Sequence, residues 1–414
     1  MKLYIVAPFF PPSPLPPSQR IRLMMPYLGK MDVKVTIFTT DEKFREEIPD
    51  PWMLDLVGTN FETVIVKCLP QRITRRFGIG DLGLRMMPFL FFKLLKEIRR
   101  QKPDFILFPV PPWNILIMVP MLYRLTGIKY GIDYIDPWIE KDIQPSFKKK
   151  ISQWIAWAME KSVVKRASVI FAVSDGINEQ LMADYPFLRK ERLIGVPYGG
   201  EPMDFKYFES NGQNLHSYQK LRYIGGVGPD MHEVVRAVLL TVKKIAKKRH
   251  IRAEFIGTTY ATAKLARPVM IDMINEYQLG DIVSEQPERV PYQKALELYM
   301  DSDLILLFGG MKTYYAASKL MGILLSGKPM VAFVHRNSFP SIFLERVNFK
   351  WVVTYTDKRG DLPVDHIEEL SDAMESLLKD PGSFRKVDQE STELKNYTAE
   401  AMTKVFIENI KKYV

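Results

Sequence analysis

Short apolar segments alternate with longer amphipathic segments along almost the whole of this 414-residue chain. In the first half the strand-like segments are LYIVAPFF, VKVTIFTT, TVIVKCL, FILFPV, YGIDYI and SVIFAVS. A second series follows, with LRYIGGVG, AEFIG, IVSEQPERV, LILLFGG and MVAFV as its strands. Strands that alternate with helices form parallel, doubly wound sheets, which bind ligands at the carboxyl ends of the strands. The chain is therefore predicted to be an α/β protein built from two such sheets.

A polar stretch separates the two series and predicts the boundary between two domains. A chain of 414 residues is too long for a single hydrophobic core. We expect a first Rossmann-like domain over residues 1–198, a connection over 199–220 and a second Rossmann-like domain over 221–397. Residues 398–414 have the pattern of an amphipathic helix.

The composition limits the class of protein. Hydrophobic residues make up 47% and charged residues 26% of the chain, as in globular proteins. The single cysteine, Cys68, suits a reducing compartment, so we expect a cytoplasmic protein. The longest apolar stretch, 105–123, contains four prolines, and the amino terminus has no cleavage site of small residues. We therefore expect neither a membrane-spanning helix nor a secretory signal.

The net charge of +10 favours a partner that carries negative charge. We find no recognisable nucleic-acid-binding module and expect no nucleic acid. Segments 72–102 and 147–166 mix Lys and Arg with Phe, Trp or Met at helical spacing, as helices at a membrane surface do. Alternatively, both are ordinary amphipathic helices whose apolar faces pack on a sheet. Peripheral contact with an anionic membrane, at its inner face, stays an open expectation.

Segment 314–333, YYAASKLMGILLSGKPMVAF, carries the clearest signal for a bound anion. It is predicted to form a helix from Ser318 to about Leu325, a Gly-Lys-Pro turn and a buried strand from Met330. A helix N-terminus attracts negative charge, and Ser318 and Lys319 would lie in its first turn. We expect a nucleotide diphosphate here, and we count Tyr315 with the same site.

Two further segments are predicted to line this site. Gly225, Gly226 and Gly228 lie between a strand and a helix, where the backbone can approach a phosphate closely. A turn that binds nothing is the alternative. Arg289 and Tyr292 lie between the next strand-like segment and a helix, and we expect them near the base and ribose. The proline between them would serve only to start the helix in the alternative interpretation.

Polar residues of the first domain are expected on the acceptor side. DYIDPW ends a predicted strand, so Asp136 would emerge at the carboxyl edge of the sheet, followed by Trp138. Asp136 would orient the acceptor, accept its proton or bind the donor sugar, unless it only caps the next turn. Asp133 is the second catalytic candidate. Ser18 and Arg20 lie where a Pro-rich loop enters its helix, and a solvated surface arginine is the alternative for Arg20.

These segments resemble glycosyltransferase family 4, in which Ser-Lys-Leu opens the donor-site helix and Ser-Gly-Lys-Pro closes it. Further blocks resemble a bacterial polysaccharide-biosynthesis subgroup: PPSPLPPSQRIR, FGIGDLGLR, DYIDPW, VPYGGEPMDF and RVPYQKAL. The resemblance covers nearly the whole chain, and RVPY matches the family's base-binding loop. It implies a GT-B fold, with two domains facing each other across a cleft and a C-terminal helix that crosses back to the first domain.

The resemblance also implies an activity. A sugar would pass from a nucleotide-diphosphate sugar to a saccharide or lipid-linked acceptor in surface polysaccharide or glycolipid synthesis, without a cofactor. No metal is expected either. Asp301-Ser302-Asp303 has the form of the DxD metal signature of the other glycosyltransferase fold, but it precedes a strand rather than ending one.

Several positions depart from the family pattern. Gly322 replaces a glutamate that usually holds the ribose, and Gly226 and Met231 stand where an arginine and a lysine are usual. All five histidines follow residue 215, so a carboxylate must serve where many relatives use a histidine of the first domain. These departures leave two alternatives to a transferase. One is a non-catalytic nucleotide-sugar-binding or scaffold protein, and the other is a GT-B nucleotide-sugar epimerase.

Overall fold

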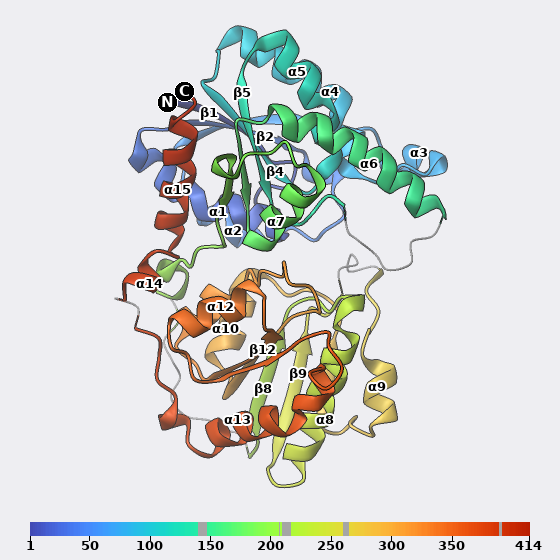
Figure 1. Ribbon diagram of the computed structural model, residues 1–414, viewed down its shortest axis with the longest axis vertical. Coiled ribbons are helices and arrows are strands. Elements are labelled where there is room, and N and C mark those ends of the chain that lie inside the picture. Colours follow the sequence, from blue (N-terminus) through green and yellow to red (C-terminus); the bar gives the residue numbers. More distant parts are fainter. Residues whose placement is uncertain (140–146, 207, 209–216, 260–264, 389–390) are drawn as a thin grey trace. The chain divides into compact units, whose positions relative to one another are not determined.

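The structure is a computed structural model that describes residues 1–139, 147–206, 208, 217–259, 265–388 and 391–414, without the side chains of 147–152. The chain forms two compact units (Figure 1). The first contains Met1–Tyr198 together with Ala399–Val414, and the second contains Gly199–Thr398. Each unit is built around one parallel sheet.

The first unit contains a seven-stranded sheet in the order β3-β2-β1-β4-β5-β6-β7, and its strands pair in parallel. The central strand FILFPV is buried at every position, as expected for a parallel strand covered on both faces. The strands are β1 (Lys2–Val6), β2 (Lys34–Thr40), β3 (Phe61–Val66), β4 (Phe105–Val110), β5 (Lys129–Tyr134), β6 (Val169–Ala172) and β7 (Leu193–Gly195).

Helices connect these strands and cover the sheet. The C-terminal helix packs against α1 and β6 of this unit, and the rings of Phe406 and Phe171 lie 4.3 Å apart. The helices are α1 (Pro16–Leu28), α2 (Trp52–Asp55), α3 (Gln71–Thr74), α4 (Leu82–Arg100), α5 (Val119–Thr126), α6 (Phe147–Arg166), α7 (Asp175–Asp184) and α15 (Ala399–Lys411).

The second unit contains a six-stranded parallel sheet in the order β10-β9-β8-β11-β12-β13. Its strands are β8 (Gln219–Ile224), β9 (Ile251–Ile256), β10 (Val283–Gln286), β11 (Leu304–Phe308), β12 (Met330–His335) and β13 (Val352–Tyr355). Its helices are α8 (His232–Ala246), α9 (Ile271–Glu276), α10 (Tyr292–Met300), α11 (Leu320–Ser326), α12 (Phe339–Arg346), α13 (Ile367–Lys379) and α14 (Thr392–Lys395).

The predicted α/β fold with two doubly wound sheets is confirmed, but two helices differ from the expectation. The sequence pattern over 263–278 also predicts a helix, but the structure forms one only at Ile271–Glu276, since Pro268 disfavours the helical conformation in the residue before it. Part of that expected range lies outside the described residues. The helix expected from Ser318 begins two residues later, at Leu320. Over the described residues, no helix is both long and apolar enough to span a membrane.

Candidate functional site

The second sheet has a topological switch point between β8 and β11. The strands β9 and β10 follow β8 toward one edge, whereas β12 and β13 follow β11 toward the other. In doubly wound sheets, ligands bind beyond the carboxyl ends of the two strands at which the order reverses. The loop Gly225–Gly228 leaves β8 at this edge, and the glycine pair Gly309-Gly310 leaves β11 beside it. The residues predicted to bind a diphosphate therefore lie around the switch point.

Lys319 is a basic residue that reaches this edge of the sheet. It lies at the N-cap of α11, and its amine donates a hydrogen bond to the carbonyl oxygen of Ile224 over 3.2 Å. The same amine lies 3.6 Å from the centre of the Tyr223 ring. A carbonyl oxygen and an aromatic face orient the amine without neutralising its charge.

The electrostatic surroundings of Lys319 favour a negatively charged ligand. Burial, followed by the nearby positive charge of Arg289, holds the pKa of the Lys319 amine well below its usual range. Both effects disfavour the ammonium form, and an anion beside the amine would reverse them. Arg289 is half-buried, and its backbone lies against Gly257. A Cβ added at Gly257 would lie 3.6 Å from the Cα of Arg289. Lys319 and Arg289, which come from separate predicted segments, are thus brought near each other.

Gly225 is required by the close approach of Lys319. Its φ is +153°, which residues with side chains rarely adopt, and a methyl group there would collide with the Lys319 amine. The next peptide is held in place because the Tyr223 hydroxyl donates to the carbonyl oxygen of Gly226 over 2.8 Å. Glycine at position 225 therefore lets the amine lie directly against the loop.

A carboxylate, Asp230, faces the same loops. A methyl group at Gly310 would collide with its side chain, and an added Cβ at Gly228 would lie 2.7 Å from one of its oxygens. In the sequence, Asp230 has only the pattern of an acidic residue at a helix start. The signal for its role is the second glycine pair, which follows β11 directly and permits the carboxylate to approach.

Two tyrosines hold the segment after β11. The Tyr355 hydroxyl donates to the carbonyl oxygen of Gly309 over 2.7 Å, and the Tyr315 hydroxyl donates to that of Phe308 over 3.2 Å. Burial, with smaller contributions from Tyr315 and Asp230, raises the pKa of Tyr355, so that its hydroxyl stays a neutral donor. Tyr315 therefore has a position beside the switch point.

Two further predicted residues, Ser318 and Tyr292, lie at the starts of helices. Ser318 is exposed and lies in a tight turn before α11, because the amide of Leu320 donates to Ala317 rather than to a residue of a longer helix. The Tyr292 hydroxyl donates to a carboxylate oxygen of the buried Asp204 over 2.6 Å, so that contact holds the start of α10.

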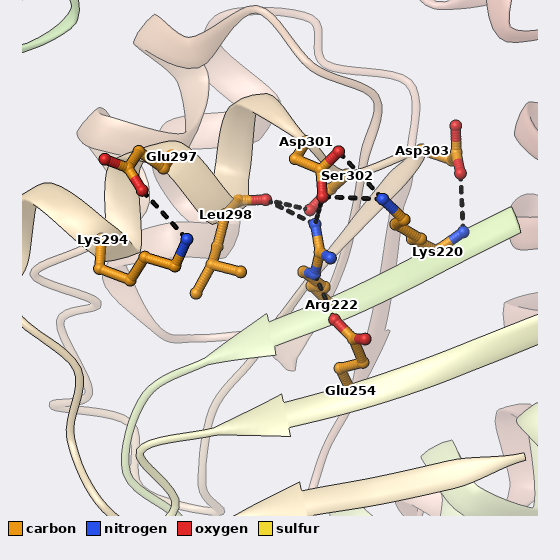
Figure 2. A network of polar contacts seen from close by, with 9 residues as sticks. All are labelled: Lys220, Arg222, Glu254, Lys294, Glu297, Leu298, Asp301, Ser302 and Asp303. Carbon is orange, nitrogen blue, oxygen red and sulfur yellow. Dashed lines mark hydrogen bonds and ion pairs between the residues drawn. The ribbon is translucent and has the colours of Figure 1, made fainter. Parts of the chain in front are cut away.

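The DxD sequence lies at the opposite edge of the sheet, before β11 begins (Figure 2). Asp301 accepts hydrogen bonds from Lys220 at 2.8 Å and Arg222 at 3.0 Å, and Asp303 accepts one from the backbone amide of Lys220 at 2.7 Å. Arg222 also pairs with Glu254 of β9. Although partial burial raises the pKa of Asp301, the hydrogen bonds from Lys220 and Arg222 outweigh it and lower that pKa. Asp301 thus neutralises cations of β8, and Asp303 holds the backbone near the start of that strand.

In the first unit, Arg20 and Asp133 form a fully buried ion pair. Two guanidinium nitrogens each donate to one carboxylate oxygen over 3.0 Å, and a third contact reaches the carbonyl oxygen of Pro197 at 3.0 Å. The guanidinium lies between the rings of Tyr198 and Phe406. We therefore assign Arg20 and Asp133 to the interior of the unit rather than to contact with a substrate.

The remaining predicted residues of the first unit are near the ends of their elements. Asp136 is exposed two residues beyond β5, and its carbonyl oxygen accepts a hydrogen bond from the Trp113 indole at 3.1 Å. Trp138 is half-buried. Ser18 is buried in α1, and its hydroxyl has no hydrogen-bond partner among the described residues. Asp136 is thus the predicted catalytic carboxylate that the structure leaves at the surface.

Comparison with solved structures identifies the fold. No family profile and no curated protein matches the sequence. The structure is similar to sucrose-phosphate synthase from Thermosynechococcus elongatus, with a TM-score of 0.68, 13% identity and coverage of 100% of this chain and 98% of that chain. It is also similar to Anabaena HepE in complex with UDP-glucose, with a TM-score of 0.66, 13% identity and full coverage of both chains. A UDP-GlcNAc 2-epimerase from Neisseria meningitidis matches both chains fully with a TM-score of 0.54 and 13% identity. The chain therefore has the GT-B fold.

Proposed function

We propose that this protein is a glycosyltransferase of the family 4 type that uses a nucleotide-diphosphate sugar as its donor. The observation that carries the proposal is the Lys319 amine at the switch point of the second sheet, held against Gly225 and near Arg289. A departing diphosphate develops negative charge, and fixed cations that lie beside it lower the barrier to sugar transfer. HepE, which has the same fold, binds UDP-glucose. We therefore propose a uridine diphosphate sugar as the first donor to test with this protein.

The other residues of the second unit supply the remaining donor contacts in this proposal. Asp230 accepts hydrogen bonds from hydroxyl groups of the sugar, because a carboxylate beside phosphate-binding loops would repel the diphosphate itself. Arg289 lies toward the base and ribose, where its charge also compensates for the missing cations at Gly226 and Met231. The ribose contact that Gly322 cannot make is left to the backbone of these loops.

On the acceptor side, we assign proton removal from the attacking hydroxyl to Asp136. Transfer requires a base for that hydroxyl, and the first unit contains no histidine. Asp136 is exposed after β5 and can be reached by an acceptor, whereas Asp133 is fully buried in the interior of the unit. The acceptor that we propose is a saccharide or a lipid-linked saccharide.

Two other functions fit particular observations. The likeness to a UDP-GlcNAc 2-epimerase keeps open a reaction on the nucleotide sugar itself. The glycines and methionine at positions 322, 226 and 231 favour a protein that binds the nucleotide sugar without turning it over. Both alternatives retain the donor site and differ from a transferase in the product that they release.

A two-stage experiment tests the proposal. A thermal-shift screen against nucleoside diphosphates and their sugars should show a rise in melting temperature with one base, since a ligand that binds the folded state stabilises it. Chromatography of reactions with that nucleotide sugar then separates the functions. A transferase releases nucleoside diphosphate only with an acceptor, an epimerase changes the sugar without release, and a binding protein does neither. No shift with any nucleotide would contradict the proposal.

A further inference from the structure

Three neighbouring helices of the first unit expose aromatic and basic side chains together. Helix α5 contacts both α4 and α6, and the three appear on one side of the unit in Figure 1. On α4 the exposed residues Phe89, Phe92, Lys96 and Arg99 recur every three or four positions and so share one stripe. The Phe92 side chain is 70% exposed. An aromatic stripe on the solvent face of a helix has no role in the core of this unit.

The neighbouring helices continue the same pattern. On α5 the exposed residues are Met121, Arg124 and Leu125, and Leu125 is 63% exposed. On α6 the exposed Trp154, which is 69% exposed, is followed by Ile155, Trp157, Lys161 and Lys165. We call the exposed residues of these three helices the α4–α6 face.

The α4–α6 face contains no acidic side chain. Only two acidic residues occur in the three helices, Glu97 of α4 and Glu160 of α6, and both are buried. Glu97 pairs with Lys93 and Arg100, whereas Glu160 accepts hydrogen bonds from two tyrosine hydroxyls. Glu97 therefore balances charge at Lys93 and Arg100 only, and the exposed surface of the three helices keeps an excess of positive charge.

We infer that the α4–α6 face binds the surface of an anionic lipid bilayer. Lys and Arg attract anionic headgroups, and Trp, Phe and Leu side chains enter the boundary between headgroups and acyl chains. A second copy of the chain is a poorer occupant, because a self-complementary contact would bring basic residues against basic residues. A nucleic acid would neutralise the basic residues, but exposed aliphatic side chains such as Leu125 and Met121 neither stack on its bases nor form hydrogen bonds with them.

This inference concerns the first unit alone and does not depend on the proposed donor site. The expected mode of binding is peripheral, with the three helices lying on the bilayer surface. Such binding would bring the protein to acceptors that are anchored in lipid, if the proposed transferase function holds. Vesicle binding is measured without nucleotide, so its failure and the failure of donor binding are separate results.

Co-sedimentation with vesicles tests the inference. The full chain is expected to sediment with vesicles of phosphatidylcholine and phosphatidylglycerol, and not with phosphatidylcholine alone. Because each cation near an anionic surface changes the partition coefficient by about five-fold, Lys96→Glu with Arg99→Glu should lower it by more than about ten-fold. Phe92→Ser with Trp154→Ser should lower it several-fold at unchanged net charge.

Matched controls in the second unit are Lys379→Glu, at the end of α13, and Ile342→Ser, an exposed residue of α12. Both should leave vesicle binding unchanged, and thermal unfolding checks that every variant is folded. Absence of binding to anionic vesicles would overturn the inference, as would equal losses in the control variants. Self-association that Phe92→Ser with Trp154→Ser abolishes, or binding of a single-stranded oligonucleotide in place of vesicles, would likewise overturn it.

Discussion

The amine of Lys319 lies 3.2 Å from the carbonyl oxygen of Ile224, and this contact joins residues 95 positions apart in the chain. Ile224 is the last residue of β8, so the contact fixes the amine at the carboxyl edge of the sheet. Among the described residues its partners are a carbonyl oxygen and an aromatic ring, neither of which is a counter-ion. An anionic ligand is the group that would complete these interactions.

Replacement of Gly225 by alanine is expected to weaken nucleoside diphosphate binding. The added methyl group would displace the Lys319 amine, and the backbone conformation at φ +153° disfavours a side chain. Binding requires the loop in this conformation, so a strain of about 1–3 kcal/mol corresponds to a loss of affinity of roughly five-fold to a hundred-fold. Isothermal titration measures it. Gly280→Ala is the matched control, since a methyl group there meets no atom within 4 Å.

Asp230 is expected to distinguish a nucleotide sugar from the nucleotide alone. A hydrogen bond to a charged group contributes about 1.5–3 kcal/mol, so Asp230→Ala should weaken nucleotide-sugar binding by roughly ten-fold or more. Binding of the nucleoside diphosphate should be unchanged or stronger, because a negative charge is removed. Titrations of both ligands give the two values, with Glu233→Ala as the control in the same helix start. Equal weakening of both ligands would contradict the role assigned to Asp230.

The pair formed by Arg20 and Asp133 is expected to stabilise the first unit only as a pair. Removal of one partner leaves a buried charge alone, so Asp133→Asn should lower the free energy of unfolding by about 3–5 kcal/mol. Apolar residues often replace a buried pair with little loss, so Arg20→Met with Asp133→Leu should unfold at higher urea than the single variant. If Asp133→Asn keeps wild-type stability and loses turnover, Asp133 is catalytic.

Glu160 makes the stability of the first unit depend on pH. Burial raises the pKa of its carboxyl to about 7, despite hydrogen bonds from Tyr134 and Tyr185 that favour the charged form. Between the unfolded pKa of 4.5 and about 7, the folded state holds a proton that the unfolded state has lost, so stability falls as pH rises. The loss is on the order of 3 kcal/mol. Urea unfolding at several pH values measures it, and a slope that persists in Glu160→Gln would contradict this origin.

The sequence was sufficient for the fold because both sheets follow from periodicity. Apolar strands such as FILFPV and LILLF are buried at every position, and the segments between them carry helical patterns. The residue at which helix α11 begins was not predictable in the same way. Ser318 has the sequence pattern of an N-cap. The hydrogen bond from the amide of Leu320 to the carbonyl oxygen of Ala317 forms a turn there instead, so the helix begins at Leu320. Local chemistry alone does not determine which of these two arrangements forms.

The sequence singles out Lys319 and Gly225 because one short segment carries each signal; the structure brings the two together, and their role in binding stays a prediction. Pairings between distant segments were not predictable. In the sequence, Asp133 is a polar residue near the end of a strand and Arg20 lies at the start of a helix, and only the folded unit brings them together in its interior. Asp230 was explained by its own helix start, and its approach to Gly310 depends on the neighbouring order of β8 and β11.

Isothermal titration of UDP into wild-type protein, Lys319→Met and Lys328→Met tests the central claim most directly. Methionine keeps the length of the side chain and removes its amine. Lys328 lies at the other end of α11, two residues beyond its last residue. A charge-assisted hydrogen bond contributes about 1.5–3 kcal/mol, so Lys319→Met should weaken UDP binding roughly ten-fold to a hundred-fold. Lys328→Met should bind as the wild type does. Equal affinity of all three proteins for UDP, or no binding of UDP by the folded wild type, would contradict a uridine diphosphate site at Lys319.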